Sequence, residues 1–165
     1  MSPVKSTLRI NVADVPIHRV EPPSQGAPTP VEVRMVYGTD TGMMVARRNK
    51  GYHSRPHYHD SEQFNYVLEG EIWFFIGDEG FRCRQGDFVR VPRNIVHWTW
   101  VRSELGCTMV ETHTPSLTGD PELVKGALPL VGPGEVADQN GVDNIFIDFP
   151  QAKVIEVRAL AADPD

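Results

Sequence analysis

Short runs with a strand-like pattern of apolar residues fill the middle of the chain. They lie at 31–37, 43–48, 64–68, 71–76, 81–84, 88–91, 95–101 and 108–112. Turn residues separate them, for example Glu69-Gly70, Gln85-Gly86-Asp87 and Pro92-Arg93-Asn94. Between 31 and 113 no convincing helical period occurs. A turn about every eight residues is typical of an antiparallel barrel or sandwich, so we expect an all-β fold.

The two ends of the chain follow other patterns. Apolar residues alternate over 7–12, which predicts a first strand. Residues 21–30 contain four prolines, which exclude helix and central strand, so an extended surface connector is expected there. Asp120 and Pro121 suit the N-cap and first turn of one short helix. Residues 144–149 and 153–160 are expected to be final strands.

Length and charge restrict the class of protein. The 165 residues predict a single domain over 1–165, with a barrel core at 31–114, an N-terminal arm at 1–30 and a C-terminal extension at 115–165. A net charge of −6 argues against binding to nucleic acid or to an anionic membrane. No run approaches the roughly 20 apolar residues that span a bilayer. Two cysteines do not suggest a disulfide framework, and we expect a soluble, cytoplasmic protein.

Three histidines occupy positions that suit a metal site. His57 and His59 are two residues apart, so in an extended strand both imidazoles point to the same face, and Gln63 has the same parity. His97 lies in a later strand and could converge with them on one cation inside a barrel. A bare His-x-His pattern, however, more often marks histidines that ordinary hydrogen bonds satisfy.

The surrounding residues resemble the two motifs of the cupin family. Gly51, His57-Tyr58-His59, Gln63 and Gly70 have the spacing of the first motif, and Gly86, Pro92, Asn94 and His97 have that of the second. The resemblance covers roughly residues 40–113. The chain is similar to small single-domain cupins of the metal-binding type, with three departures. Gln63 replaces the usual Glu, Asn94 replaces the usual Gly, and Val101 replaces the Asn usually found four residues after the last His.

The resemblance implies a jelly-roll-like antiparallel β-barrel with extended N- and C-terminal segments. It also implies one divalent metal ion per chain, bound by the first-motif histidines, the residue at 63 and His97. Iron(II) is the favoured ion, and nickel, manganese or zinc are alternatives. Many cupins are dimers, and the two long terminal segments here would suit a homodimer that exchanges terminal strands.

Glu62 is the rival to Gln63 as the fourth ligand. A shift of one residue moves a side chain to the opposite face of a strand, so parity favours Gln63 unless a bulge intervenes. The choice matters because three imidazoles and an amide leave the full charge of the ion in place. Such a centre favours an anionic substrate.

Other polar residues are candidates for substrate chemistry. Glu111 and His113 share one face of the last barrel strand and are the candidate catalytic residues; if that face is interior, Glu111 could act as a base and His113 as an extra ligand. The alternative is that both are solvated. Arg47 could bind a substrate carboxylate, unless it belongs to a solvated edge, and His53 is a candidate for the mouth of the barrel.

Three functions compete for this set of residues. The favoured one is a metal-dependent dioxygenase acting on a small enolic or phenolic substrate. The second is a non-redox metal enzyme, namely an isomerase, lyase, decarboxylase or polyketide-type cyclase, which an extra ligand such as His113 would favour. The third is a small-molecule-binding module without turnover. The fold alone does not choose among them, because one fold hosts many chemistries.

Overall fold

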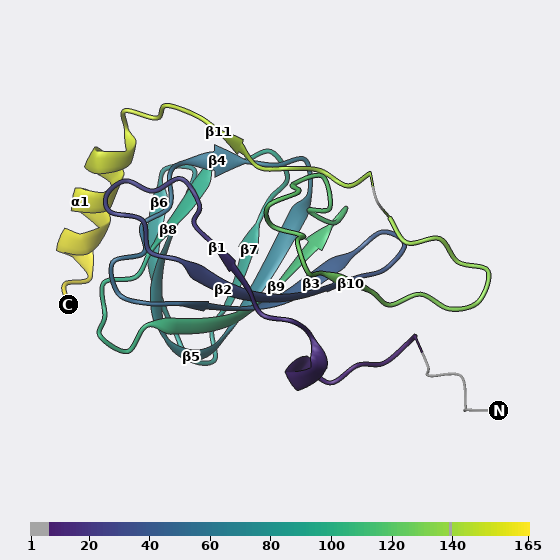
Figure 1. Ribbon diagram of the computed structural model, residues 1–165. Helices are drawn as coiled ribbons and strands as arrows, with labels where there is room; N and C mark the ends of the chain where they lie inside the picture. Colours follow the sequence, from purple (N-terminus) through teal and green to yellow (C-terminus); the bar gives the residue numbers. More distant parts are fainter. Residues whose placement is uncertain (1–6, 139) are drawn as a thin grey trace.

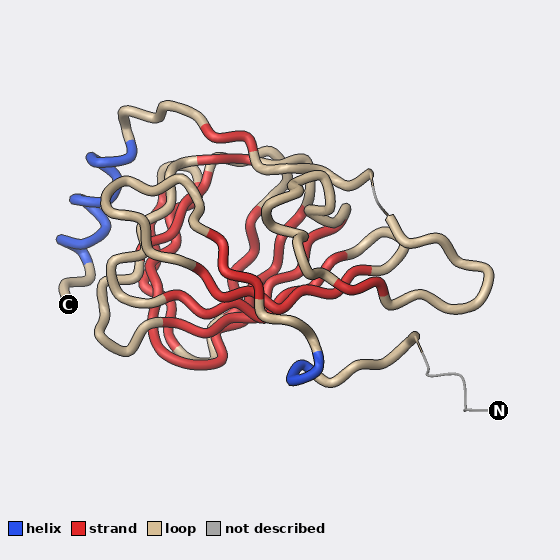
Figure 2. Tube along the Cα trace, in the orientation of Figure 1, coloured by secondary structure: helices blue, strands red, loops and turns tan. Residues whose placement is uncertain are grey.

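The computed structural model describes residues 7–138 and 140–165 (Figure 1). A short 3-10 helix, Val12–Asp14, precedes the strands. The strands are β1 His18–Val20, β2 Val31–Tyr37, β3 Gly42–Arg48, β4 His57–Tyr58, β5 Glu62–Ile76, β6 Glu79–Arg84, β7 Phe88–Val91, β8 His97–Trp100, β9 Cys107–Thr114, β10 Leu128–Pro129 and β11 Ile145–Phe146. Helix α1, Ala152–Ala162, ends the chain and packs against one side of the strands (Figure 2).

All eleven strands belong to one curled sheet, in the order β1-β2-β3-β9-β5-β8-β4-β11. Strands β6 and β7 both pair with the long strand β5, and among the described strands only β10 pairs in parallel, with β2. The prediction of an all-β antiparallel barrel is therefore confirmed. The strands expected at 31–37 and 88–91 have the expected bounds.

The strands expected at 64–68 and 71–76 form one continuous strand, β5, with an irregular register between Val67 and Glu69. Gly70 follows this irregularity with φ +78°. A Cβ at Gly70 would lie 1.9 Å from the carbonyl oxygen of Gly106, so glycine is required there. The turn residue bends the strand from one half of the barrel into the other and does not end it.

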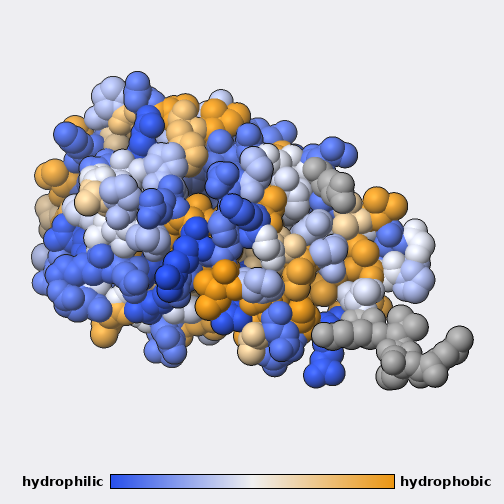
Figure 3. All heavy atoms as spheres, viewed as in Figure 1, coloured by the Kyte–Doolittle hydropathy of each residue, from blue (hydrophilic) through white to orange (hydrophobic). Residues whose placement is uncertain are grey.

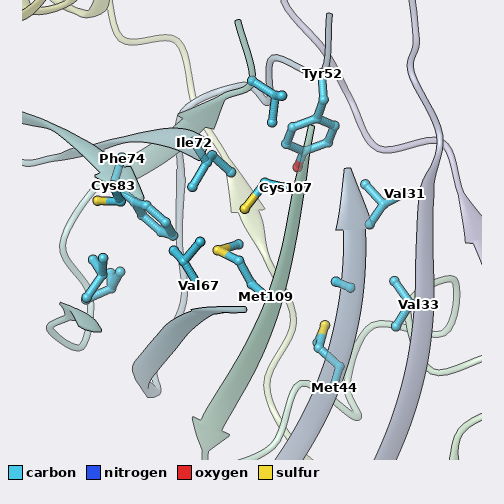
Figure 4. Close-up of a cluster of buried hydrophobic side chains, with 14 of the residues drawn as sticks. Val31, Val33, Met44, Tyr52, Val67, Ile72, Phe74, Cys83, Cys107 and Met109 are labelled. Carbon is cyan, nitrogen blue, oxygen red and sulfur yellow. The ribbon is translucent and has the colours of Figure 1, made fainter. Parts of the chain in front are cut away.

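Alternate residues of the strands fill the barrel. In β9 every second residue is buried from Cys107 to His113, as expected for a strand with one interior face. Figure 4 shows Val67 and Met109 facing each other in the core, while Val31, Val33 and Met44 lie on the side of β2 and β3. This second group also forms the wall of the cavity described below.

The prediction of a strand at 153–160 is wrong, because these residues form helix α1. The valines and isoleucine favour a strand by intrinsic propensity, but burial follows a helical period: Ala152 and Ile155 are buried, whereas Val154 and Val157 are exposed. The buried face covers Trp98, so the outward-facing tryptophan of β8 packs on this chain's own helix.

The other terminal predictions also need correction. Residues 7–12 form no strand, and the apolar alternation there leads into the 3-10 helix. The short helix expected after Asp120 is a series of turns, although the Asp120 side chain accepts hydrogen bonds from the backbone of Glu122 and Leu123 as an N-cap does. The strand expected at 144–149 shortens to β11.

The outer surface is mainly hydrophilic, with scattered hydrophobic patches on the face that Figure 3 shows. Among the described residues, no helix is long and apolar enough to cross a membrane.

Candidate metal centre

The three motif histidines come together at one end of the barrel. His57 in β4 pairs with His97 in β8, and their ring centroids are 4.3 Å apart. The ring of His59 lies 4.8 Å from that of His97 and 6.2 Å from that of His57. The turn before β8 is held by Asn94, whose φ is 60° and whose N–H donates to the carbonyl of His59 at 2.9 Å. Asparagine tolerates this left-handed conformation better than most residues, so the turn survives without glycine.

A backbone carbonyl oxygen lies beside Nδ1 of each of the three rings. Nδ1 of His57 lies 2.9 Å from the carbonyl oxygen of Arg55, and Nδ1 of His97 lies 2.9 Å from that of Ile95. A ring that donates from Nδ1 keeps a lone pair on Nε2, which is how metal-binding histidines are commonly held. Nε2 of His97 is buried and has no hydrogen-bond partner in the part of the chain that the structure describes.

Ser61 offers His59 a choice of two tautomers. Its carbonyl oxygen lies 3.1 Å from Nδ1 of His59 and can accept a proton, while its hydroxyl lies 2.9 Å away and can donate one. In the first case Nε2 of His59 is an acceptor, and in the second it carries a proton that points at Gln63. His59 can therefore present either a proton or a lone pair at the same place.

Burial keeps these histidines neutral. It lowers the pKa of His57 to about 4, and it lowers the pKa of His97 well below the ordinary value, with the neighbouring His57 adding to the effect. Burial also lowers the pKa of His59. Because imidazole binds a metal ion only in its neutral form, the rings are ready to bind at neutral pH without first losing a proton.

Gln63 lies where strand parity predicts, with its side chain buried beside His59. Its Oε1 is 3.0 Å from Nε2 of His59. Its amide nitrogen donates to Oδ1 of Asn65 at 2.9 Å and to Oε1 of Glu111 at 3.2 Å, which fixes the amide with its oxygen toward the histidines. Glu62 points outward and forms an ion pair with Arg90.

The donors fit a divalent metal ion in their chemistry, and one pair of them also fits in spacing. Two ligands at right angles on an ion with bonds of about 2.1 Å lie about 3.0 Å apart, which matches the separation of His59 Nε2 and Gln63 Oε1. The unpartnered Nε2 of His97 needs a cation or a donor. No group of three or more His, Cys, Asp or Glu among the described residues is already arranged to hold a metal ion. The proposal of a metal ion therefore rests on the chemistry of the donor atoms and on the unpartnered Nε2 of His97.

The inward face of β9 brings Glu111 and His113 to the same region. Both are buried, so the solvated alternative does not apply. The ring of His113 lies 5.3 Å from that of His59, and burial lowers its pKa well below the ordinary value. Its Nδ1 has no partner among the residues that the structure describes. Glu111 pairs with Arg48 at 2.7 Å.

Arg47 and His53 do not reach the cavity. The guanidinium of Arg47 lies on the outside and donates to the carbonyl of Leu105 at 2.9 Å. The ring of His53 stacks on Trp100 with centroids 4.2 Å apart, and its Nε2 lies 2.7 Å from Glu156 of α1. His53 thus helps to hold the C-terminal helix.

Arg48, which sequence reasoning missed, takes the place expected for Arg47. It is 8% exposed and shares the inward parity of Met44 and Ala46, both buried apolar residues of β3. That parity was a usable signal. Phe146 was also missed; it comes from β11, pairs with His57 and approaches its ring to 5.2 Å. A contact across such a long sequence separation leaves no local pattern.

A cavity of about 300 Å³ lies beside these side chains, and its lining contains His57 and His59 but not His97. Its polar lining includes Arg48, His57, His59, Gln63, Glu111 and His113. Most of the remaining wall is apolar and comes from β2, β3 and the two terminal segments. The volume suits a small molecule.

The comparisons with known proteins agree with this architecture. The family described as "Cupin domain" matches residues 44–113. The matched segment, which is less than half of the chain, extends from β3 to β9 and contains both predicted motifs, with the candidate ligands and Glu111. No curated protein matches the chain.

Several solved structures share the fold at low sequence identity. The polyketide cyclase RemF from Streptomyces resistomycificus is 17% identical, with a TM-score of 0.56 over 72% of this chain and 97% of RemF. Oxalate decarboxylase from Bacillus subtilis is 15% identical, with a TM-score of 0.53 over 68% of this chain and 30% of that one. A cupin 2 conserved barrel domain protein from Rhodopseudomonas palustris is 12% identical, with a TM-score of 0.54 over 61% of this chain and 72% of that one. The likeness concerns the fold alone.

Proposed function

We propose that this cupin binds one divalent metal ion through His57, His59, His97 and Gln63 and acts as an enzyme on a small anionic substrate. The observation that carries the proposal is the shared orientation of the three imidazoles. Each has its Nδ1 beside a backbone carbonyl, and Nε2 of His97 is buried without a partner among the described residues. Nothing but a cation or a donor satisfies that atom.

The bound ion would supply Lewis acidity, which four neutral ligands leave undiminished. The residues around it contribute three things. Glu111 and Asn65 hold the Gln63 amide in one orientation, the apolar walls exclude water, and His113 keeps a neutral imidazole at the cavity. A neutral imidazole beside a substrate can accept a proton from carbon or oxygen.

The position of His113 favours non-redox chemistry over oxygen chemistry. The ring lies 5.3 Å from His59 and lines the same cavity, so it can serve as an additional ligand or as a base. An additional ligand leaves fewer positions for oxygen. Enolisation, as isomerases, lyases and cyclases require, needs only a Lewis acid and a base; a polyketide cyclase has the same fold.

The dioxygenase remains the second candidate, because one feature supports it. No carboxylate belongs to the proposed ligand set, since Glu62 points outward and Glu111 is paired with Arg48. Three imidazoles leave positions for a substrate and for oxygen when Gln63 and His113 stay unbound. Iron would be the expected ion in that case.

Acetylacetone separates the two candidates. For the non-redox enzyme we expect metal-dependent exchange of its central protons for deuterium without oxygen, followed by proton NMR, and loss of exchange in His113→Gln. Consumption of oxygen by the iron-loaded protein with acetylacetone or catechol would support the dioxygenase instead. His18→Gln is the control, because His18 lies on β1, outside the barrel interior. If the protein shows neither activity when loaded with iron, nickel, manganese or zinc, the proposal that it is an enzyme is contradicted.

A further inference from the structure

Arg48 is a buried cation whose hydrogen-bonding capacity is only partly used. It is 8% exposed, and its Nη2 donates to Oε2 of Glu111 at 2.7 Å. Its Nε and Nη1 are buried and have no partner within the described part of the chain. Buried polar groups in native proteins nearly always have partners, so two idle guanidinium donors at a cavity indicate a ligand that accepts from them.

The guanidinium is held in place from two sides. Glu111 binds one end, and the other oxygen of Glu111 accepts from Gln63, so Arg48 is connected to the candidate metal ligand by a chain of hydrogen bonds. The ring of Tyr52 lies 5.2 Å from its Cζ. Burial alone would lower the pKa of Arg48, but the Glu111 carboxylate and, after it, the side chain of Tyr52 raise it above the ordinary value. The positive charge is therefore permanent and its orientation is fixed before a ligand binds.

The apolar side chains that line the cavity near Arg48 indicate the chemistry of the rest of such a ligand. Val31 and Val33 of β2 and Met44 of β3 border the cavity, and Figure 4 shows their side chains on the same side of the barrel as Tyr52. Leu117 from the C-terminal extension closes the wall. A ligand here needs an apolar body beside its anionic group.

The rim of the cavity restricts the charge of the ligand. Glu21, Asp120 and Glu122 belong to the cavity lining. Glu21 and Glu122 are exposed and Asp120 is half-buried. Glu111 already offsets one positive charge inside. Carboxylates of this kind repel a dianion more than a monoanion, so a phosphate ester is disfavoured relative to a carboxylate.

We propose that Arg48 is the anion-binding residue of the cavity and that it takes a monocarboxylate with a small apolar body, through Nε and Nη1. Nε and a terminal nitrogen form the fork that matches the two oxygens of a carboxylate. The inference deepens the proposed function by naming the class of substrate and rests on the same cavity. The contact itself needs no metal ion.

Benzoate, benzamide and phenyl phosphate are the probes, and calorimetry measures their binding to the full chain, both metal-loaded and stripped with a chelator. We expect benzoate to bind the stripped protein about 10- to 100-fold more tightly than neutral benzamide. Phenyl phosphate should bind more weakly than benzoate. Absence of benzoate binding to the wild-type protein, or tighter binding of phenyl phosphate, would overturn the proposal.

Two neighbouring arginines provide a matched pair of variants. Arg48→Lys keeps the charge but loses the fork, and should weaken benzoate binding about tenfold. Arg47→Lys makes the same change on the outside of the strand and should leave benzoate binding unchanged. The double variant Arg48→Gln, Glu111→Gln removes both charges without leaving one unpaired, and should bind benzoate and benzamide alike. Equal benzoate affinity in the wild type and in either Arg48 variant that folds would overturn the proposal.

The metal titration separates this inference from the proposed function. Benzoate binding that depends on Arg48 in a protein that binds no metal ion would contradict the metal enzyme and support the anion site. Stoichiometric metal binding with no preference for benzoate over benzamide would support the metal site and contradict the anion site.

Discussion

Acidification should destabilise the metal-free protein well above the pH at which its carboxylates titrate. His57, His97 and His113 have pKa values lowered by burial in the folded state, that of His57 to about 4. In the unfolded chain each pKa returns to about 6.5. Below pH 6.5 the unfolded chain therefore binds protons that the folded protein does not bind, and stability falls as the pH falls toward the folded pKa.

The size of the effect follows from the shifts. Between pH 7.5 and 5.5 a histidine that stays neutral in the folded state loses about 1.4 kcal/mol of stabilisation. The three buried histidines together lower the free energy of unfolding by about 4 kcal/mol, a large part of the 5–15 kcal/mol that typical domains possess. His59, whose pKa burial also lowers, adds to the loss.

Urea unfolding of chelator-treated protein at several pH values measures this slope. His113→Gln should reduce the loss of stability between pH 7.5 and 5.5 by about 1.4 kcal/mol, because it removes one of the three groups. His18→Gln, on the outer strand β1, is the matched control. A free energy of unfolding that stays constant over this range would refute the reasoning, as would equal effects of the two variants.

Further predictions concern the site, the fold and the oligomeric state. Gln63→Ala should weaken metal affinity by about tenfold or more in a competitive titration, whereas Glu62→Ala should leave it unchanged; the reverse order would show that the carboxylate is the ligand. Glu156→Leu should lower the free energy of unfolding by about 2–4 kcal/mol, because two buried donors lose their acceptor, and Lys153→Leu on the exposed side of α1 should have little effect. Gly70→Ala should cost more than about 3 kcal/mol in chemical unfolding, since its Cβ would lie 1.9 Å from a carbonyl oxygen; a cost under about 1 kcal/mol would contradict the requirement for glycine. The homodimer expected from the terminal segments stays a prediction, and light scattering of the purified protein tests it.

The sequence predicts the barrel well because its signals there are local. Turn residues and two-residue alternation specify β2, β3 and β7 closely. The prediction failed where tertiary contacts decide. Residues 153–160 have the composition of a strand but form a helix, because one face of the helix packs on Trp98. Gly80 has no side chain, which leaves room for Ala159 of the helix beside it.

In the candidate site, too, some residues could be predicted from local patterns in the sequence and others depend on tertiary contacts. His57, His59, His97 and Gln63 could be placed from spacing and parity, because each lies on or next to a strand with a buried face. The inward position of Arg48 follows from the same parity. The contribution of Phe146 depends on the chain returning from the C-terminal extension to pair with β4, and no periodicity in the sequence encodes that return.

Metal stoichiometry measured by elemental mass spectrometry tests the central claim most directly. Wild-type protein that has been stripped and reloaded should retain about one divalent ion per chain after dialysis, and His97→Ala should retain none, because it removes one of four proposed ligands. His18→Ala should retain as much as the wild type. A wild-type protein without bound metal, or undiminished metal in His97→Ala, would contradict the account.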